Sequence, residues 1–194
     1  SNFGTDWMEW NRTVLKYLAS HIEYISLHTY VGSGGDYYEF MAQPVNVDVR
    51  IERTEDLIEE TRLRQKIQKP IYISFDEYNV WHRANEHYEV PYVFEDVLVV
   101  AGFLNSFVRH ADSVKMANIA QVVNVLAPIH AEEKGLYLHT IYYALQLFAQ
   151  HMHGTALDTL VKCGTFKAAG FDAVPYLDVG AAYRADKKQV VLAV

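Results

Sequence analysis

The chain has 194 residues, which is enough for one ordinary domain with a sizeable hydrophobic core. Acidic residues outnumber basic ones, 24 against 17, and the net charge of −7 argues against a surface that binds nucleic acid. The sequence holds no apolar run of the roughly 20 residues that a membrane helix needs. The single cysteine, Cys163, excludes an internal disulfide, and neither cysteine nor histidine spacing indicates a metal site.

Helices and strands are expected to alternate along the first two thirds of the chain. A helix over residues 7–21 has apolar side chains at helical spacing, and a strand over residues 23–30 follows it and ends at a glycine-rich stretch. A long charged helix over residues 47–68 comes next, and a strand over residues 71–75 follows it. This order indicates βα units around a parallel sheet.

A polar, aromatic loop over residues 78–92 is longer than most connections and is therefore a candidate functional loop. A helix over residues 94–110 and a strand over residues 113–118 complete the third unit. Beyond Pro128 the pattern changes to shorter extended runs, which predict a separate β region. Three βα units cannot close a barrel of eight strands, so both ends are expected to continue into something larger.

Polar side chains that could carry chemistry follow three successive strands. They are His28 and Tyr30 after the first, Asp76 and Glu77 after the second, and Asn118 and Gln121 after the third. The carboxyl ends of parallel barrel strands converge on one mouth, where catalytic groups are found. The sequence therefore predicts one site built from these strand ends.

Three segments also carry a family resemblance, and they read YISLHTY at 24–30, DEYNVW at 76–81 and KMANIAQVVN at 115–124. In this order and at this spacing they resemble glycoside hydrolase family 51, the α-L-arabinofuranosidases. The match runs from about Trp10 to Val179. The resemblance implies an α/β fold: residues 1–135 form the C-terminal part of a (β/α)8 TIM barrel, about strands 6–8. Residues 136–194 then form the end of the barrel, the transition and the first strands of a C-terminal β-sandwich.

The resemblance also implies roles for individual residues. Glu77 matches the catalytic nucleophile at the end of barrel strand seven. His28 and Tyr30 match substrate-pocket residues after strand six, Trp81 matches a pocket aromatic, and Gln121 matches a sugar-contacting amide after strand eight. No residue matches a metal ligand.

A retaining glycosidase needs two carboxyl groups about 5 Å apart, one as nucleophile and one as general acid and base. The family carries its acid in a Gly-Asn-Glu motif, which this sequence lacks. Asp76 is an unlikely substitute, because neighbouring residues of a regular strand point to opposite faces. The general acid is therefore expected outside this chain, and the chain alone is expected to be inactive.

The implied activity is removal of terminal α-L-arabinofuranosyl units from arabinan or arabinoxylan-type oligo- or polysaccharides, with retention of configuration and without a cofactor. The expected partner is such a glycan, with no nucleic acid and no membrane. The resemblance implies a homo-oligomer for the full-length enzyme. A cytoplasmic location is expected, because no signal peptide is visible.

Two other hypotheses remain open from the sequence. The first is a retaining β-glycanase or β-xylosidase of the same barrel clan, with the same nucleophile strand and a different pocket. The second is a non-catalytic half-barrel or interaction module that needs a complement. The site residues also admit structural roles: His28 as a core histidine, Tyr30 and Trp81 as packing aromatics, and Gln121 as a loop amide.

Two smaller expectations concern side chains outside the predicted site. Asn79 is expected to order its loop rather than to contact sugar. Six histidines are expected on the solvated surface: His82, His87, His110, His130, His151 and His153.

Overall fold

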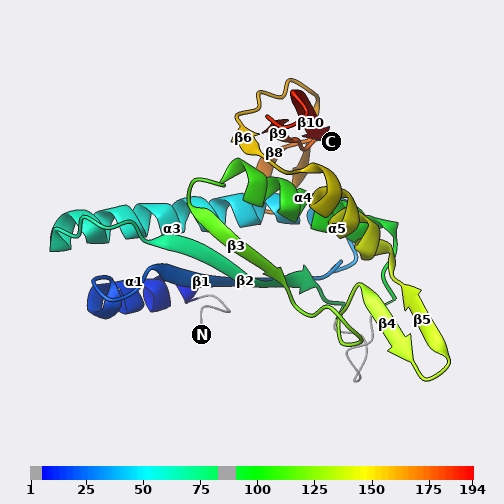
Figure 1. Cartoon of the computed structure of the whole chain (residues 1–194), viewed down its shortest axis with the longest axis horizontal. Helices are drawn as coiled ribbons and strands as arrows, with labels where there is room; N and C mark the ends of the chain where they lie inside the picture. Colours follow the sequence, from blue (N-terminus) through cyan, green and yellow to red (C-terminus); the bar gives the residue numbers. More distant parts are fainter. Residues whose placement is uncertain (1–5, 83–90) are drawn as a thin grey trace.

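The computed structural model describes residues 6–82 and 91–194 and has a mixed α/β architecture (Figure 1). Three strands, β1 (Tyr24–Val31), β2 (Tyr72–Val80) and β3 (Val114–Ile119), form a parallel sheet in the order β1-β2-β3. Parallel neighbours need crossover connections, and helices α3 (Gln43–Gln65) and α4 (Phe94–Arg109) provide them. The carboxyl ends of all three strands consequently lie along one edge of the sheet.

The long helices have identifiable start and stop signals. Pro44 occupies the first turn of α3, where its missing N–H costs nothing, and Lys66 in a left-handed conformation ends that helix. At the start of α4 the Asp96 carboxylate accepts a hydrogen bond from the Val93 N–H at 2.7 Å. Two further helices, α1 (Trp7–Leu18) and the short α2 (Tyr37–Met41), precede α3, and α1 packs against it.

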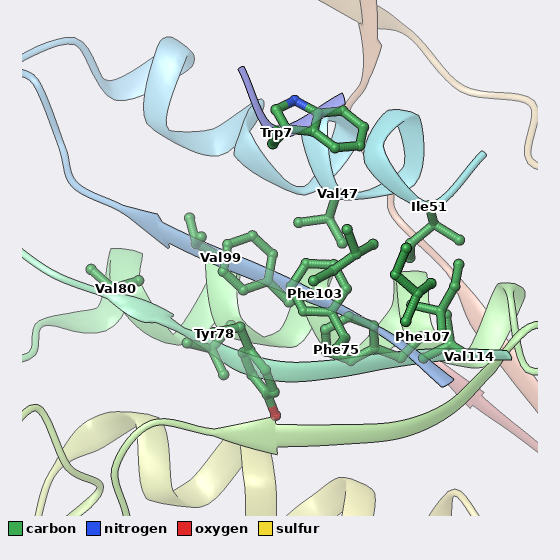
Figure 2. Close-up of a cluster of buried hydrophobic side chains, with 14 of the residues drawn as sticks. Trp7, Val47, Ile51, Phe75, Tyr78, Val80, Val99, Phe103, Phe107 and Val114 are labelled. Atoms are coloured by element: carbon green, nitrogen blue, oxygen red, sulfur yellow. The ribbon is translucent and has the colours of Figure 1, made fainter. Parts of the chain in front are cut away.

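The main hydrophobic core lies between β2 and the two crossover helices (Figure 2). The Phe107 ring of α4 lies 5.0 Å from the Phe75 ring and 4.9 Å from the Tyr78 ring, measured between centroids. Val47 and Ile51 of α3 are fully buried in the same cluster. One face of β2 therefore belongs to the core, and its other face is left for the polar residues.

A β-bulge interrupts β2 where its polar residues begin. Ser26 of β1 pairs with Ser74, but His28 pairs with Glu77, so β2 carries one extra residue over this stretch. Phe75 and Tyr78 both face the core although they are three residues apart. Asp76 and Glu77 then share the opposite face, and the expectation that they point to opposite faces is wrong.

Short antiparallel elements make up the C-terminal part. Strands β4 (Ile129–Glu132) and β5 (Gly135–Leu138) form a hairpin, which helix α5 (Thr140–His151) follows. A three-stranded sheet has the order β10-β9-β6, from β6 (Thr155–Leu157), β9 (Gly180–Arg184) and β10 (Gln189–Ala193). Strands β7 (Thr165–Ala168) and β8 (Phe171–Pro175) form a second hairpin.

Helix α4 lies between the parallel sheet and the C-terminal strands, since it contacts both β2 and β9 (Figure 1). Helix α5 packs against α4 and joins the helical layer. None of the helices within the described residues has the length and apolarity needed to cross a membrane.

Most predicted elements are confirmed within a few residues, with three differences. Strand β2 continues to Val80, so the predicted loop begins later than expected. Trp10 of the predicted apolar stripe is 50% exposed, and α1 buries Trp7 and Leu15 instead. The sequence patterns also left α2 and the short strands β4, β5, β6, β7 and β9 unpredicted.

Candidate functional site

The candidate site lies at the carboxyl ends of β1 and β2, on the face of the sheet away from the core. Alternation along β1 buries Ile25 and Leu27 and directs Ser26, His28 and Tyr30 to this face. The bulge in β2 adds Asp76 and Glu77 to the same face. These five residues, Ser26, His28, Tyr30, Asp76 and Glu77, are called the strand-end cluster below.

One carboxylate oxygen of Glu77 accepts a hydrogen bond, and the side chain stays partly exposed to solvent. The Tyr30 hydroxyl donates a hydrogen bond to Glu77 Oε2 at 2.9 Å, and His28 Nδ1 lies 3.6 Å from the same oxygen. The Glu77 side chain remains 44% exposed. The carboxylate is thus fixed in direction while it stays accessible from the mouth of the sheet.

Tyr30 is suited to its role as a neutral donor. Burial and the hydrogen bond to Glu77 both raise the pKa of Tyr30 above its usual range, so the phenol keeps its proton at neutral pH. A hydroxyl that donates to a carboxylate stabilises the ionised carboxylate. The Tyr30 ring also meets the Trp81 ring edge to face, with 5.9 Å between centroids.

Trp81 directly follows β2 and extends its pairing with β1. The Trp81 N–H donates to the carbonyl of Val31 at 2.6 Å. A Cβ atom at Gly32 would lie only 2.9 Å from the Trp81 carbonyl oxygen, so this close approach requires glycine at that position. The first glycine of the predicted glycine-rich stretch thereby helps to place an aromatic wall beside Tyr30.

Asp76 contacts the other edge of the His28 ring. Ser26 Oγ donates to Asp76 Oδ1 at 2.7 Å, and His28 Nε2 lies 3.1 Å from both Asp76 Oδ1 and Ser26 Oγ. His28 therefore lies between the two carboxylates. Asp76 was expected among the polar strand ends but without a role, and Ser26 was missed, although the alternation Ser26, His28, Tyr30 along one strand is the signal that identifies Ser26.

Gln121 follows β3 at the same edge of the sheet and is exposed. The backbone just before it is fixed from β2: the Ala120 N–H donates to the Tyr78 carbonyl at 3.2 Å, and Asn79 Nδ2 donates to the Ala120 carbonyl at 3.0 Å. The Asn79 amide also donates to the carbonyl of Leu126. Asn79 is fully buried within β2, and its side-chain amide donates to the segment that follows β3, whereas the expectation concerned the loop over residues 78–92.

The surface prediction for the histidines is only partly correct. His151 and His153 are exposed, but His82, His110 and His130 are largely buried and lie beside carboxylates. His82 Nε2 lies 2.7 Å from Asp96 Oδ1, and His82 Nδ1 accepts from the Ser33 N–H at 3.3 Å. His87 lies outside the described residues.

The arrangement has the elements of a carboxylate nucleophile rather than of a metal centre. In the parts of the chain that the structure describes, no group of three or more His, Cys, Asp or Glu side chains could hold a metal ion. Glu77 offers an accessible, hydrogen-bonded carboxylate beside an aromatic wall, a combination suited to attack on a sugar carbon.

Comparison with known proteins places this geometry in a family. A sequence model described as the α-L-arabinofuranosidase C-terminal domain matches residues 76–193. A relative from Halalkalibacterium halodurans, named an intracellular exo-α-(1→5)-L-arabinofuranosidase, is 33% identical over 95% of this chain and 40% of its own length. A similarly named relative from Bacillus subtilis is 30% identical over the same shares of both chains.

Solved structures agree with the sequence relatives. A family 51 α-L-arabinofuranosidase from Bifidobacterium longum matches with a TM-score of 0.90 and 25% identity, covering 98% of this chain and 42% of that one. An arabinose complex of the enzyme from Thermotoga maritima matches with a TM-score of 0.84 and 30% identity, covering 97% and 41%. The chain thus spans about two fifths of the length of the proteins it matches.

Proposed function

Because this chain belongs to the glycoside hydrolase family 51 α-L-arabinofuranosidases, we propose that it carries the nucleophile half of a retaining α-L-arabinofuranosidase active site. The observation that carries the proposal is the Glu77 carboxylate, which is held by Tyr30 and open on one side. The three parallel strands are proposed to be strands 6–8 of a (β/α)8 barrel in residues 1–135. Residues 136–194 are proposed to lead into a β-sandwich.

Each site residue has a proposed role in the reaction. Glu77 attacks the anomeric carbon of the arabinofuranosyl unit and forms a covalent glycosyl-enzyme. Tyr30 holds the carboxylate in its attacking direction, and His28 lines the pocket beside it. Trp81 supplies an apolar wall for the sugar, and Gln121 contacts sugar hydroxyl groups from the neighbouring strand.

The second carboxyl group that the mechanism needs is proposed to lie outside this chain. Asp76 is the carboxyl beside Glu77 within the described residues, but its Oδ1 atom is held by Ser26 and His28. The chain spans about two fifths of its relatives, which leaves most of their sequence as a source of the acid. The isolated chain is therefore proposed to be inactive.

The proposed substrate is a terminal α-L-arabinofuranosyl unit on arabinan or arabinoxylan-type oligo- or polysaccharides. Support comes from relatives named exo-α-(1→5)-L-arabinofuranosidases and from the matched structure that is described as an arabinose complex. The same relatives are named intracellular, which supports a cytoplasmic location. Exposed apolar side chains beside and on the β4–β5 hairpin, such as Val122 and Leu136, support a homo-oligomer.

The test uses a chimera in which residues 1–194 replace the matched part of the Halalkalibacterium halodurans relative. The chimera is expected to hydrolyse 4-nitrophenyl α-L-arabinofuranoside, and Glu77→Ala is expected to lower kcat by a factor on the order of 10⁴ or more. Added azide should restore turnover by attacking in place of the missing carboxylate. Because this is a single displacement, the glycosyl azide should have inverted configuration.

The matched control is Glu52→Ala, which removes an exposed carboxylate on α3 and should leave turnover unchanged. Loss of less than tenfold in the Glu77 variant, or an azide product with retained configuration, would contradict the nucleophile role. Preference for aryl β-xylosides over the arabinofuranoside would contradict the substrate class.

A further inference from the structure

We propose that Asp76, together with Ser26, is a positioning residue that acts through His28 on the carboxylate of Glu77. The inference rests on the proposed function, since it concerns the same nucleophile. It assigns a task to the second carboxylate of the site, for which the proposed reaction has no other role.

The first step concerns the proton on the His28 ring. An ionised carboxylate can only accept hydrogen bonds, so Asp76 Oδ1 needs donors, and Ser26 Oγ–H is one of them at 2.7 Å. A serine hydroxyl has a single proton, and once it is directed to Asp76 the oxygen can only accept from His28 Nε2 at 3.1 Å. Nε2 must therefore carry a proton, directed to Ser26 and Asp76.

The second step concerns the orientation of the ring. With the ring proton on Nε2 and fixed by two acceptors, the unprotonated Nδ1 edge of His28 faces Glu77, 3.6 Å from Oε2, so the ring donates no hydrogen bond to the nucleophile. The His28 backbone is held separately, because Arg50 Nη1 of α3 donates to the His28 carbonyl at 3.1 Å. The strand position of His28 therefore does not depend on Asp76, whereas the direction of its ring does.

The third step concerns the β-bulge. In a regular strand Asp76 and Glu77 would point to opposite faces, and His28 could not contact both carboxylates. The extra residue in β2 places both acids on the His28 face. Bulges of this kind redirect side chains beside active sites, and this one gives Glu77 a charged neighbour that is itself held by Ser26.

The test has one arm on the chain itself. Nitrogen-15 NMR of the neutral His28 ring should show the proton on Nε2. Asp76→Ala and Ser26→Ala should each move part of that proton to Nδ1, whereas Asp76→Asn should retain most of it because its amide oxygen still accepts. Asp56→Ala, an exposed aspartate change on α3, should leave the ring signals unchanged.

The second arm measures turnover in the chimera described above. Asp76→Ala should lower kcat by about 10- to 100-fold with KM changed less than twofold, because a proton moved to Nδ1 would be donated to Glu77 and weaken the nucleophile, which costs rate rather than ground-state binding. Asp76→Asn should recover a large part of the loss. If Asp76→Ala misfolds, Ser26→Ala and Asp76→Asn carry the same comparison.

The outcomes separate this inference from the proposed function. Unchanged His28 signals, or an unchanged kcat in an active chimera, would overturn the positioning role of Asp76. A chimera that folds and shows the His28 response, but never hydrolyses an arabinofuranoside, would instead overturn the proposed function. An equal loss in Asp76→Ala and Asp76→Asn would show that charge, not the accepting oxygen, is required, and would overturn the tautomer argument.

Discussion

Two clusters of charged side chains lie on opposite sides of the helical layer, and they use their carboxylates differently. In the strand-end cluster two carboxylates share one imidazole, and Glu77 receives its hydrogen bond from a neutral phenol. In the second cluster Arg109 donates to Asp48 at 2.8 Å and to Asp178 at 2.6 Å, and His110 lies between Asp48 and Glu55. These five residues, Asp48, Glu55, Arg109, His110 and Asp178, are called the interface cluster.

The interface cluster fastens the C-terminal strands to the helices. Arg109 and His110 come from the end of α4, Asp48 and Glu55 from α3, and Asp178 precedes β9. Burial alone would raise the pKa of the Asp48 carboxyl, but His110 and Arg109 outweigh that effect and lower it. Burial alone would also lower the pKa of Arg109, and Asp48 and Asp178 outweigh it in the opposite direction. The carboxylates of the interface cluster are paired with cations, whereas the strand-end cluster keeps the Glu77 carboxylate accessible.

The substitution expected to change the free energy of unfolding most is Arg109→Met in the interface cluster. This change leaves Asp48 and Asp178 without their shared cation, and we expect the free energy of unfolding to fall by about 2–4 kcal/mol. The loss is smaller than for a fully buried ion pair because these side chains are partly exposed. Urea unfolding of the chain measures it. The control is Arg12→Met, whose exposed pairs with Glu9 and Glu60 should contribute about 0–1 kcal/mol. Equal losses in the two variants would remove the distinction between the interface cluster and ordinary surface pairs.

The opposite pattern is expected for Tyr30→Phe in the strand-end cluster. The change removes the hydroxyl donor of Glu77, so kcat/KM of the active chimera should fall about 10- to 100-fold, or about 1.4–2.8 kcal/mol. Stability should change by less than about 1 kcal/mol, because Glu77 remains solvated. Tyr24→Phe, at the other end of the same strand, should alter neither quantity. A large stability loss with unchanged kcat/KM would mean that Tyr30 is a packing residue.

The sequence predicted the strand-end cluster better than the interface cluster because the two differ in how far apart their members lie. His28, Tyr30 and Glu77 end strands that local hydrophobic patterns reveal, and parallel strands bring such ends together. Arg109 and Asp178 are 69 residues apart, and no local pattern indicates that they meet. The β-bulge was also missed, because one extra residue leaves the apolar composition of β2 unchanged.

Short elements escaped prediction for a related reason. Strand β6 has three residues and β7 has four, which is too few for alternation to be recognised. Their positions depend on pairing with distant segments, as in the pairing of β6 with β9. The family resemblance supplied hypotheses for the roles of side chains at the site, but the contacts of Asp76 depend on backbone geometry that only the structure gives.

The smallest expected effect is a pH dependence that arises in the interface cluster at His110. Burial alone would lower the pKa of His110, but hydrogen bonding to Asp48 and the charges of Glu55 and Asp48 outweigh it and raise the pKa above the usual value of about 6.5. A raised folded-state pKa contributes stability that is fully present below the unfolded value and is lost as pH rises through the folded value. The free energy of unfolding should therefore decline as pH rises above about 6.5, and His110→Gln should remove that part of the decline.

Urea unfolding at several pH values measures the difference between the two curves, with His151→Gln as the exposed control. Parallel curves for the wild type and His110→Gln would mean that the imidazole is held in this cluster by packing and not by its charge.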